Sequence, residues 1–170
     1  GQIADIAEYL NMNIYSSSIM SDKLLSPLDK KASKYYVYLL DSIVVDQGFQ
    51  KYKIRIIPKF KSTQLVNGYI WVSDEVWTIR EVYFEGKFDL IEFKLRNIMG
   101  EKGDEEFLPV RLNLEINFKF MGNHLEMKAD AWVKYNNVLL MLFFNYFFIL
   151  GNSTIKSYLS ISHNLHFFWS

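Results

Sequence analysis

The residues best suited to chemistry in this chain are three histidines and a short acidic segment. His163 and His166 are three positions apart, which places them on opposite faces of a strand, and His124 falls in a turn. Glu101 and the acidic run 104–106 could serve as acid and base or bind calcium, but their spacing is irregular and Lys102 interrupts them. We interpret all of these as surface residues. The sequence therefore predicts no catalytic residue, no metal site and no cofactor.

The remaining signatures of catalysis are missing from the sequence. There is no cysteine, which excludes thiol catalysis, thiolate metal sites and disulfides. No serine lies in a nucleophile elbow, and no glycine-rich phosphate loop occurs. Nineteen basic residues balance nineteen acidic ones, so the basic surface expected of a nucleic-acid-binding protein is not indicated. We expect a protein that is not an enzyme and does not bind nucleic acid.

Most of the chain alternates between apolar and polar residues, which is typical of strands with one dry and one wet face. The clearest cases are 110–120 and 125–133, joined by a glycine-containing turn at 121–124 that predicts a long hairpin. Further strands are expected at 35–45, 52–58, 65–73, 77–85 and 91–96. The apolar phase slips between Ile79 and Val82, which predicts a β-bulge near Arg80 and Glu81.

The two ends of the chain differ from this middle. Helical spacing of apolar residues predicts a short helix over 3–15, and Ser26 followed by Pro27 predicts a second one starting there. At the other end, residues 138–150 are apolar except for Asn145, a run too short for a membrane helix of about twenty residues. Alternation resumes after residue 152 and indicates one or two further strands.

These patterns predict one domain over 1–170, with a helical lead-in at 1–33, a β-meander at 34–136 and an apolar tail at 137–170. The predicted fold class is mainly β, or α+β if the short helices are counted. Its architecture is a curved antiparallel meander or half-barrel of about seven to nine strands, with N-terminal helical cover. The start at Gly1 indicates a fragment of a longer protein.

Several segments carry a resemblance to a known family. They are 25–28 (Leu-Ser-Pro-Leu), Ala32, Tyr35 with Tyr36, Leu39, 52–54, 57–59, 68–72, Asp74, Ile79 and 107–109. Together they resemble the middle domain, of unknown function, of a Bacteroidetes outer-membrane family. Its members join this domain to an N-terminal carboxypeptidase-regulatory-like domain and a C-terminal β-barrel. The meander also resembles, by fold pattern alone, periplasmic lipoprotein carriers of the LolA and LolB type.

The resemblance implies a periplasmic, outer-membrane-associated location. We expect a non-enzymatic domain whose apolar concavity binds lipid or lipoprotein acyl chains. The residues expected to line the concavity are Trp71, Phe93, Leu114, Phe118 and Met127. The alternative is a structural or docking module that pairs its sheet edge or the segment 138–150 with an outer-membrane barrel or a neighbouring chain. A homodimer through the apolar tail is part of this alternative.

Overall fold

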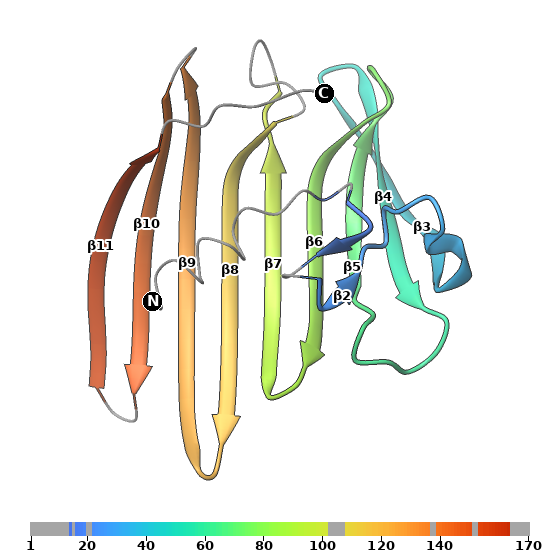
Figure 1. Ribbon diagram of the computed structural model, residues 1–170. Helices are drawn as coiled ribbons and strands as arrows, with labels where there is room; N and C mark the ends of the chain where they lie inside the picture. The colour runs from blue at the N-terminus through green and yellow to red at the C-terminus, as the bar shows by residue number, and fades with distance from the viewer. Residues whose placement is uncertain are drawn as a thin grey trace.

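The computed structural model describes residues 14, 16–19, 22–101, 108–136, 139–150 and 153–163. Most of them form one antiparallel sheet of nine strands, arranged in chain order from β3 to β11 (Figure 1). The strands are β3 (Tyr36–Asp46), β4 (Phe49–Pro58), β5 (Asn67–Ser73), β6 (Thr78–Phe88), β7 (Ile91–Met99), β8 (Pro109–Phe120), β9 (Asn123–Asn136), β10 (Leu139–Leu150) and β11 (Ser153–His163).

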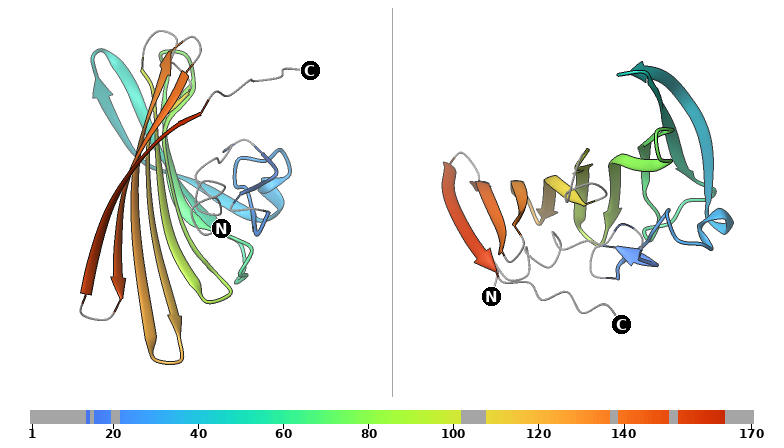
Figure 2. Two further views of the ribbon diagram at one scale, coloured as in Figure 1. Left: turned by 60° about the vertical axis from the view of Figure 1, so that its left-hand side comes forward. Right: turned by 90° about the horizontal axis from the view of Figure 1, so that it is seen from above.

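The mainly β, curved antiparallel meander that the sequence predicts is confirmed. Each predicted strand is present, with ends that differ by a few residues, and the apolar tail supplies β10 and β11. The sheet is open, because β3 and β11 each have only one neighbour. Figure 2 shows the sheet strongly twisted, with the β3–β4 hairpin leaning out from the other strands.

The predicted helix beginning at Ser26 is wrong. This part of the lead-in forms a small hairpin of β1 (Ser18–Ile19) and β2 (Leu24–Leu25), then tight turns and the 3-10 helix η1 (Ala32–Lys34). Its backbone bonds run three residues apart, as from Ala32 N–H to the Asp29 carbonyl at 2.9 Å. The Ser26 hydroxyl and Asp29 carboxylate accept from the N–H groups two positions on and so compete with an α-helix. The helix predicted over 3–15 lies outside the described residues, apart from Ile14.

The β-bulge predicted near Arg80 is confirmed. Trp71 pairs with Glu81 and Val72 pairs with Ile79, which leaves Arg80 as the extra residue on β6. A second bulge, at Asp41, was not predicted: Leu40 pairs with Ile54, and Ser42 pairs with the next residue of β4, Lys53. Because bulges increase the local twist, these two account for part of the bend of the sheet on the β3–β6 side.

The strand register divides the sheet into two faces. Residues that pair directly project to the same side, so each pair places two residues on one face. The apolar face comprises Ile54, Ile56, Ile70, Val82, Phe84, Phe93, Leu95, Leu112, Leu114, Met127 and Ala129 with their direct partners. The polar face comprises Lys53, Arg55, Tyr69, Trp71, Glu81, Tyr83, Arg96, Arg111, Glu115, Lys128 and Asp130 with theirs.

The lead-in covers the apolar face over β4 to β7. Ile14, Ile19, Leu24 and Ala32 belong to the same buried cluster as the apolar-face residues. In Figure 2 the β1–β2 hairpin and η1 lie together on one side of the sheet. Burial of such apolar surface stabilises a fold by about 25 cal/mol per Å². An otherwise one-layered sheet thus obtains its core from a segment with little regular structure.

Tyr36 links the lead-in to the sheet. Its side chain is 1% exposed, and its hydroxyl donates to the Leu25 carbonyl at 2.7 Å and accepts from the Val66 N–H at 3.2 Å. Neighbouring Tyr38 donates to the Pro27 carbonyl at 2.7 Å but is 40% exposed. The buried hydroxyl therefore joins three segments: β2, the start of β3 and the loop before β5.

Replacing Tyr36 by phenylalanine should lower the free energy of unfolding by about 1–3 kcal/mol, because it leaves the Val66 N–H and the Leu25 carbonyl buried without their partner. Tyr38→Phe is the matched control, and its effect should be less than half as large because water can replace its hydroxyl. Urea unfolding followed by circular dichroism measures both. Equal effects would contradict the linking role of Tyr36.

Alkaline pH should act on the same residue. Burial raises the pKa of Tyr36 from 10.0 to about 12, so the folded state favours the neutral phenol. The contribution of Tyr36 to the free energy of unfolding is fully present below pH 10. It is lost as pH rises from 10 towards 12, because over this interval the phenol ionises in the unfolded chain but not in the folded one. In pH titrations of stability, Tyr36→Phe should show a shallower decline over this interval than the unchanged chain, and a parallel decline would refute the assignment.

Candidate functional site

Four of the five residues predicted to line a lipid-binding concavity share the apolar face. Phe93 pairs with Ile116, which pairs with Met127, while Leu114 and Phe118 lie two positions away from Ile116 on the same strand. Trp71 is a correction to this prediction. It pairs with Lys53 and Glu81, and this register places it on the polar face.

The four residues on the apolar face are mostly covered. Phe93, Leu114 and Met127 are 2%, 0% and 5% exposed, and Phe118 is half-buried. Asn97, on the same face, is 2% exposed and its side-chain oxygen has no hydrogen-bond partner. The face is thus packed as a core in the described region, and a ligand reaching Leu114 or Met127 must displace side chains that now cover them.

An open groove of about 920 Å³ lies beside the loop between β4 and β5, at the edge of the polar face, because its strand residues Asn67, Glu85 and Lys94 are aligned on that face. Of the five predicted residues only Phe93 lines it. The groove has apolar walls from Ile57, Pro58, Phe60 and Leu65, and its charged residues are Lys61, Glu85, Lys87, Glu92 and Lys94. Its size is within the usual range for small-molecule sites, and its lining combines an apolar wall with charged and polar side chains.

The polar face carries a network of tyrosines and charged side chains. The Tyr69 and Tyr83 rings stack with centroids 5.1 Å apart, and the Lys53 ammonium lies 4.5 Å from the centre of Tyr69. Arg96 donates two hydrogen bonds to the Glu81 carboxylate, at 2.8 and 3.1 Å. A second, smaller hollow of about 380 Å³ lies over these tyrosines. The network pairs opposite charges across strands, which stabilises a solvated sheet face.

The tyrosines of this network are hydrogen-bond donors rather than bases. The pKa of both Tyr69 and Tyr83 is raised, chiefly by burial and then by the nearby carboxylates of Glu81 and Glu85. Both phenols therefore keep their protons over the physiological range. A neutral phenol donates a hydrogen bond, as Tyr83 does to the Glu85 carboxylate at 2.7 Å.

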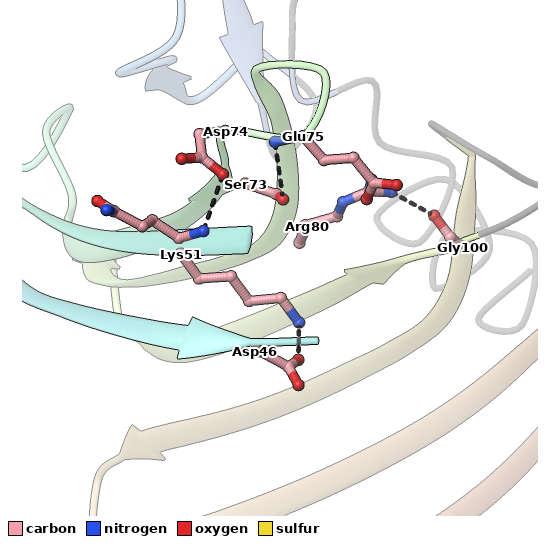
Figure 3. Close-up of polar contacts among 8 residues, drawn as sticks. Asp46, Lys51, Ser73, Asp74, Glu75, Arg80 and Gly100 are labelled. Carbon is pink, nitrogen blue, oxygen red and sulfur yellow. Dashed lines mark hydrogen bonds and ion pairs between the residues drawn. The ribbon is translucent and has the colours of Figure 1, made fainter. Parts of the chain in front are cut away.

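Polar contacts also tie together the end of the sheet near the β3–β4 and β5–β6 turns, as Figure 3 shows. The Arg80 side chain, 8% exposed, donates to the Gly100 carbonyl at 3.2 Å and lies 3.6 Å from Glu75. Beside it, Asp74 accepts from the Gln50 N–H at 2.8 Å. The bulged arginine thereby holds the β5–β6 turn against the end of β7. We interpret this cluster as structural, because its charged groups satisfy one another.

Strand β3 is the most exposed apolar element in the described part of the chain. Seven of its residues are large, hydrophobic and at least 38% exposed: Val37, Tyr38, Leu39, Leu40, Ile43, Val44 and Val45. The residues of β3 that face either side of the sheet are mostly apolar. This pattern is visible in the sequence and is the signal by which a strand with two apolar faces could have been found. The sequence did not show that β3 is an edge, since edge position depends on where the meander starts.

The remaining chemical candidates are not brought together. His124 is exposed at the start of β9 and contacts Asn117 at 3.3 Å. Most of the acidic segment at 101–106, and His166, lie outside the described residues. Within the described residues, no three histidine or acidic side chains are placed to hold a metal ion. In the same residues, no helix has the length and hydrophobicity needed to cross a membrane.

The apolar run at 138–150 corresponds to β10, an interior strand. Its backbone pairs with β9 on one side and with β11 on the other. Docking on a barrel or a partner chain through the apolar tail stays a prediction, although both backbone edges of β10 are occupied within the sheet. A homodimer through its side chains stays a prediction.

Comparison with known proteins identifies one family. The model of a family of unknown function (DUF5686) matches residues 2–136, which cover the lead-in and strands β1 to β9. No curated protein and no solved structure matches the chain.

The Arg80 cluster yields a stability test. Arg80→Ala should lower the free energy of unfolding by about 2 kcal/mol, because it leaves the Gly100 carbonyl without its charged donor. Arg55→Ala is the matched control. The Arg55 side chain is 55% exposed and makes a long ion pair with Asp41, at 3.7 Å. Its removal should therefore change the free energy of unfolding by less than about 0.5 kcal/mol. Similar losses in urea unfolding for both variants would show that the bulge does not depend on Arg80.

Proposed function

The chain belongs to this family of unknown function, and from its surface we propose that it is a non-enzymatic docking module. In this proposal, the free edge of β3 pairs with an extended segment of a neighbouring outer-membrane barrel protein, outside the closed strands of the barrel. The setting is the periplasmic, outer-membrane-associated location implied by the resemblance described above. The observation that carries the proposal is the exposed, two-sided apolar character of an edge strand.

An edge strand with this character is unusual. Its free N–H and C=O groups are a template for another strand, and soluble proteins usually protect such an edge with charges, bulges or a covering segment. Here Asp41 provides both a charge and a bulge in the middle of β3, where Lys53 lies 3.8 Å away. The residues before the bulge contact the lead-in through Tyr36 and Tyr38.

The segment after the bulge lacks that protection. Ile43, Val44 and Val45 are 50%, 43% and 72% exposed, although successive residues face opposite sides of the sheet. An added strand would shield both sides of this segment and pair its backbone. This is the recognition mode known as β-strand addition, in which the backbone supplies affinity and alternate side chains supply specificity.

Hydrogen exchange tests the pairing directly. In the full-length protein in membranes, amides of Ser42–Asp46 should exchange at least about tenfold more slowly than in the isolated chain, because pairing protects an edge. Ile43→Lys combined with Val45→Lys should abolish that difference, since charges on an edge oppose pairing. Val76→Lys is the control, because Val76 is 49% exposed but outside the edge strand.

Two results would decide against the proposal. Equally fast exchange of β3 in the membrane protein and the isolated chain would show an unpaired edge. Protection that appears in the isolated chain at high concentration, together with dimers in sedimentation, would show that a second copy occupies the edge instead.

The groove beside the β4–β5 loop supports a second candidate function, the binding of an acyl chain. Its apolar walls and the contribution of Phe93 favour it. Native mass spectrometry of the purified chain should then show a bound lipid that Ile57→Glu removes and Val76→Glu retains, because Ile57 lines the groove and Val76 is at the other end of the sheet. Spectra without lipid after incubation with phospholipid would eliminate this candidate.

A further inference from the structure

The two ends of the sheet differ in charge. One end, here named the basic end, consists of the β4–β5 loop at 59–66, the β6–β7 turn at 89–90 and the β8–β9 turn at 121–122. These three connections lie at the same end because alternate turns of a meander do so (Figure 1). The basic end carries Lys59, Lys61, Lys87 and Lys119 against Asp89 and Glu92, and Lys87 is paired with Glu92 at 3.4 Å. The opposite end carries Asp46, Asp74, Glu75 and Glu101 against two cations, Lys51 paired with Asp46 at 2.5 Å and Arg80 at 3.6 Å from Glu75.

Each of the three connections at the basic end exposes a large apolar side chain at or beside its tip. Phe60 is 52% exposed, Leu90 is 46% exposed, and Phe120 and Met121 are 49% and 84% exposed. They come from turns that are far apart in the sequence. Single exposed apolar residues are ordinary on protein surfaces, but one at each successive tip of the same end is a repeated arrangement.

Met121 is the most informative of these residues. It has φ of 47° and precedes Gly122 with φ of 81°, the conformation of a two-residue hairpin turn that favours asparagine or aspartate in the first position. Methionine there strains the backbone and exposes an apolar side chain to water. The β3–β4 hairpin uses the same kind of turn with the polar residue Gln47 before Gly48. Neither turn geometry nor solubility accounts for methionine at this tip.

We propose that the basic end docks on an anionic phospholipid surface. The tips Phe60, Leu90 and Met121 enter the interfacial region, and the lysines beside them contact the lipid phosphates. Apolar side chains flanked by lysines are the combination that binds anionic bilayer surfaces, where each lysine near the surface adds to the attraction. This inference rests on the turns at one end of the sheet and is independent of the β3 edge.

The charge pattern favours a bilayer over another protein and fixes the orientation. Val76 and Trp77 at the opposite end are also apolar and exposed, at 49% and 71%, but the carboxylates of that end outnumber its cations. An anionic membrane would repel that end and attract the basic end. The strands would then stand on the membrane with the β8–β9 turn, which reaches furthest in Figure 1, inserted most deeply.

Single-cysteine labelling tests this orientation, because the chain has no cysteine of its own. Met121→Cys and the matched control Val76→Cys each receive a polarity-sensitive fluorophore. With vesicles of phosphatidylethanolamine and phosphatidylglycerol in a 3:1 ratio, emission from position 121 should shift to the blue and position 76 should not. Far-UV circular dichroism checks that both labelled proteins are folded.

Binding itself is measured by vesicle flotation. Leu90→Ser combined with Met121→Ser should reduce the vesicle-bound fraction about tenfold, because two inserted apolar side chains are lost. The matched pair Val76→Ser and Trp77→Ser should change it less than about twofold. Vesicles of phosphatidylcholine alone, or 0.5 M salt with the anionic vesicles, should release the protein because the lysine contribution is removed or screened.

Three outcomes would overturn the proposal. One is an emission shift at position 76 as large as the shift at position 121, whether or not the protein floats with the vesicles. Another is the absence of a shift at either position. The third is equal binding to phosphatidylcholine and anionic vesicles. If the basic end binds a protein partner and not a membrane, neither label should shift when vesicles are added.

Discussion

The structure depends on one constraint: a single antiparallel sheet must bury one apolar face. No second sheet packs on this face in the described chain, so the lead-in supplies the cover, and Tyr36 is the point at which it is fastened. The tyrosine hydroxyl bonds to β2 and to the loop before β5, two segments with few other backbone partners outside themselves. Because the hydroxyl is buried, its two hydrogen bonds cannot be exchanged for water without cost. The buried Tyr36 hydroxyl holds the lead-in together with the Tyr38 hydroxyl, which donates to the Pro27 carbonyl, and the bond from the Leu25 N–H to the Gln64 carbonyl at 2.8 Å.

The cover is uneven, and this has consequences for function. It lies over β4 to β7 and includes Ile14, Leu24 and Ala32, while the outer half of β3 after Asp41 remains open to solvent on both sides. The bulges at Asp41 and Arg80 turn this part of the sheet away from the rest. An edge that leans out is accessible to an added strand without disturbance of the core.

Most of the polar face is accounted for by contacts within the sheet. On the polar face, the charged groups are mutually paired, as in the bidentate contact of Arg96 with Glu81, and the tyrosine pKa values are raised, so the phenols stay protonated. The two features that such pairing does not explain are apolar: the β3 edge and the turn tips of the basic end. They lie on different sides of the molecule, one along a strand and one across the strand ends. A partner strand and a membrane surface could therefore be engaged at the same time.

The sequence by itself determined the strand content, the order of the meander and the bulge at Arg80. These follow from local alternation, and alternation reports directly which residues of a strand share a face. The predicted hairpin of 110–133 was correct because its two faces differ sharply in polarity. Trp71 was assigned to the wrong face because residues 69–72 (Tyr-Ile-Trp-Val) are apolar or aromatic in both alternating sets, so that only pairing with Lys53 and Glu81 decides its side.

Other features are decided by the tertiary structure alone. Ser26 and Pro27 have the local pattern of a helix start, yet Ser26 is buried and bonds to the Ile14 carbonyl, a contact twelve residues away that no local rule includes. The edge position of β3, the interior position of β10 and the convergence of Phe60, Leu90 and Met121 at one end all depend on strand order and turn direction. Alternation specifies faces within a strand, whereas the ends and edges of a sheet exist only after the strands have assembled.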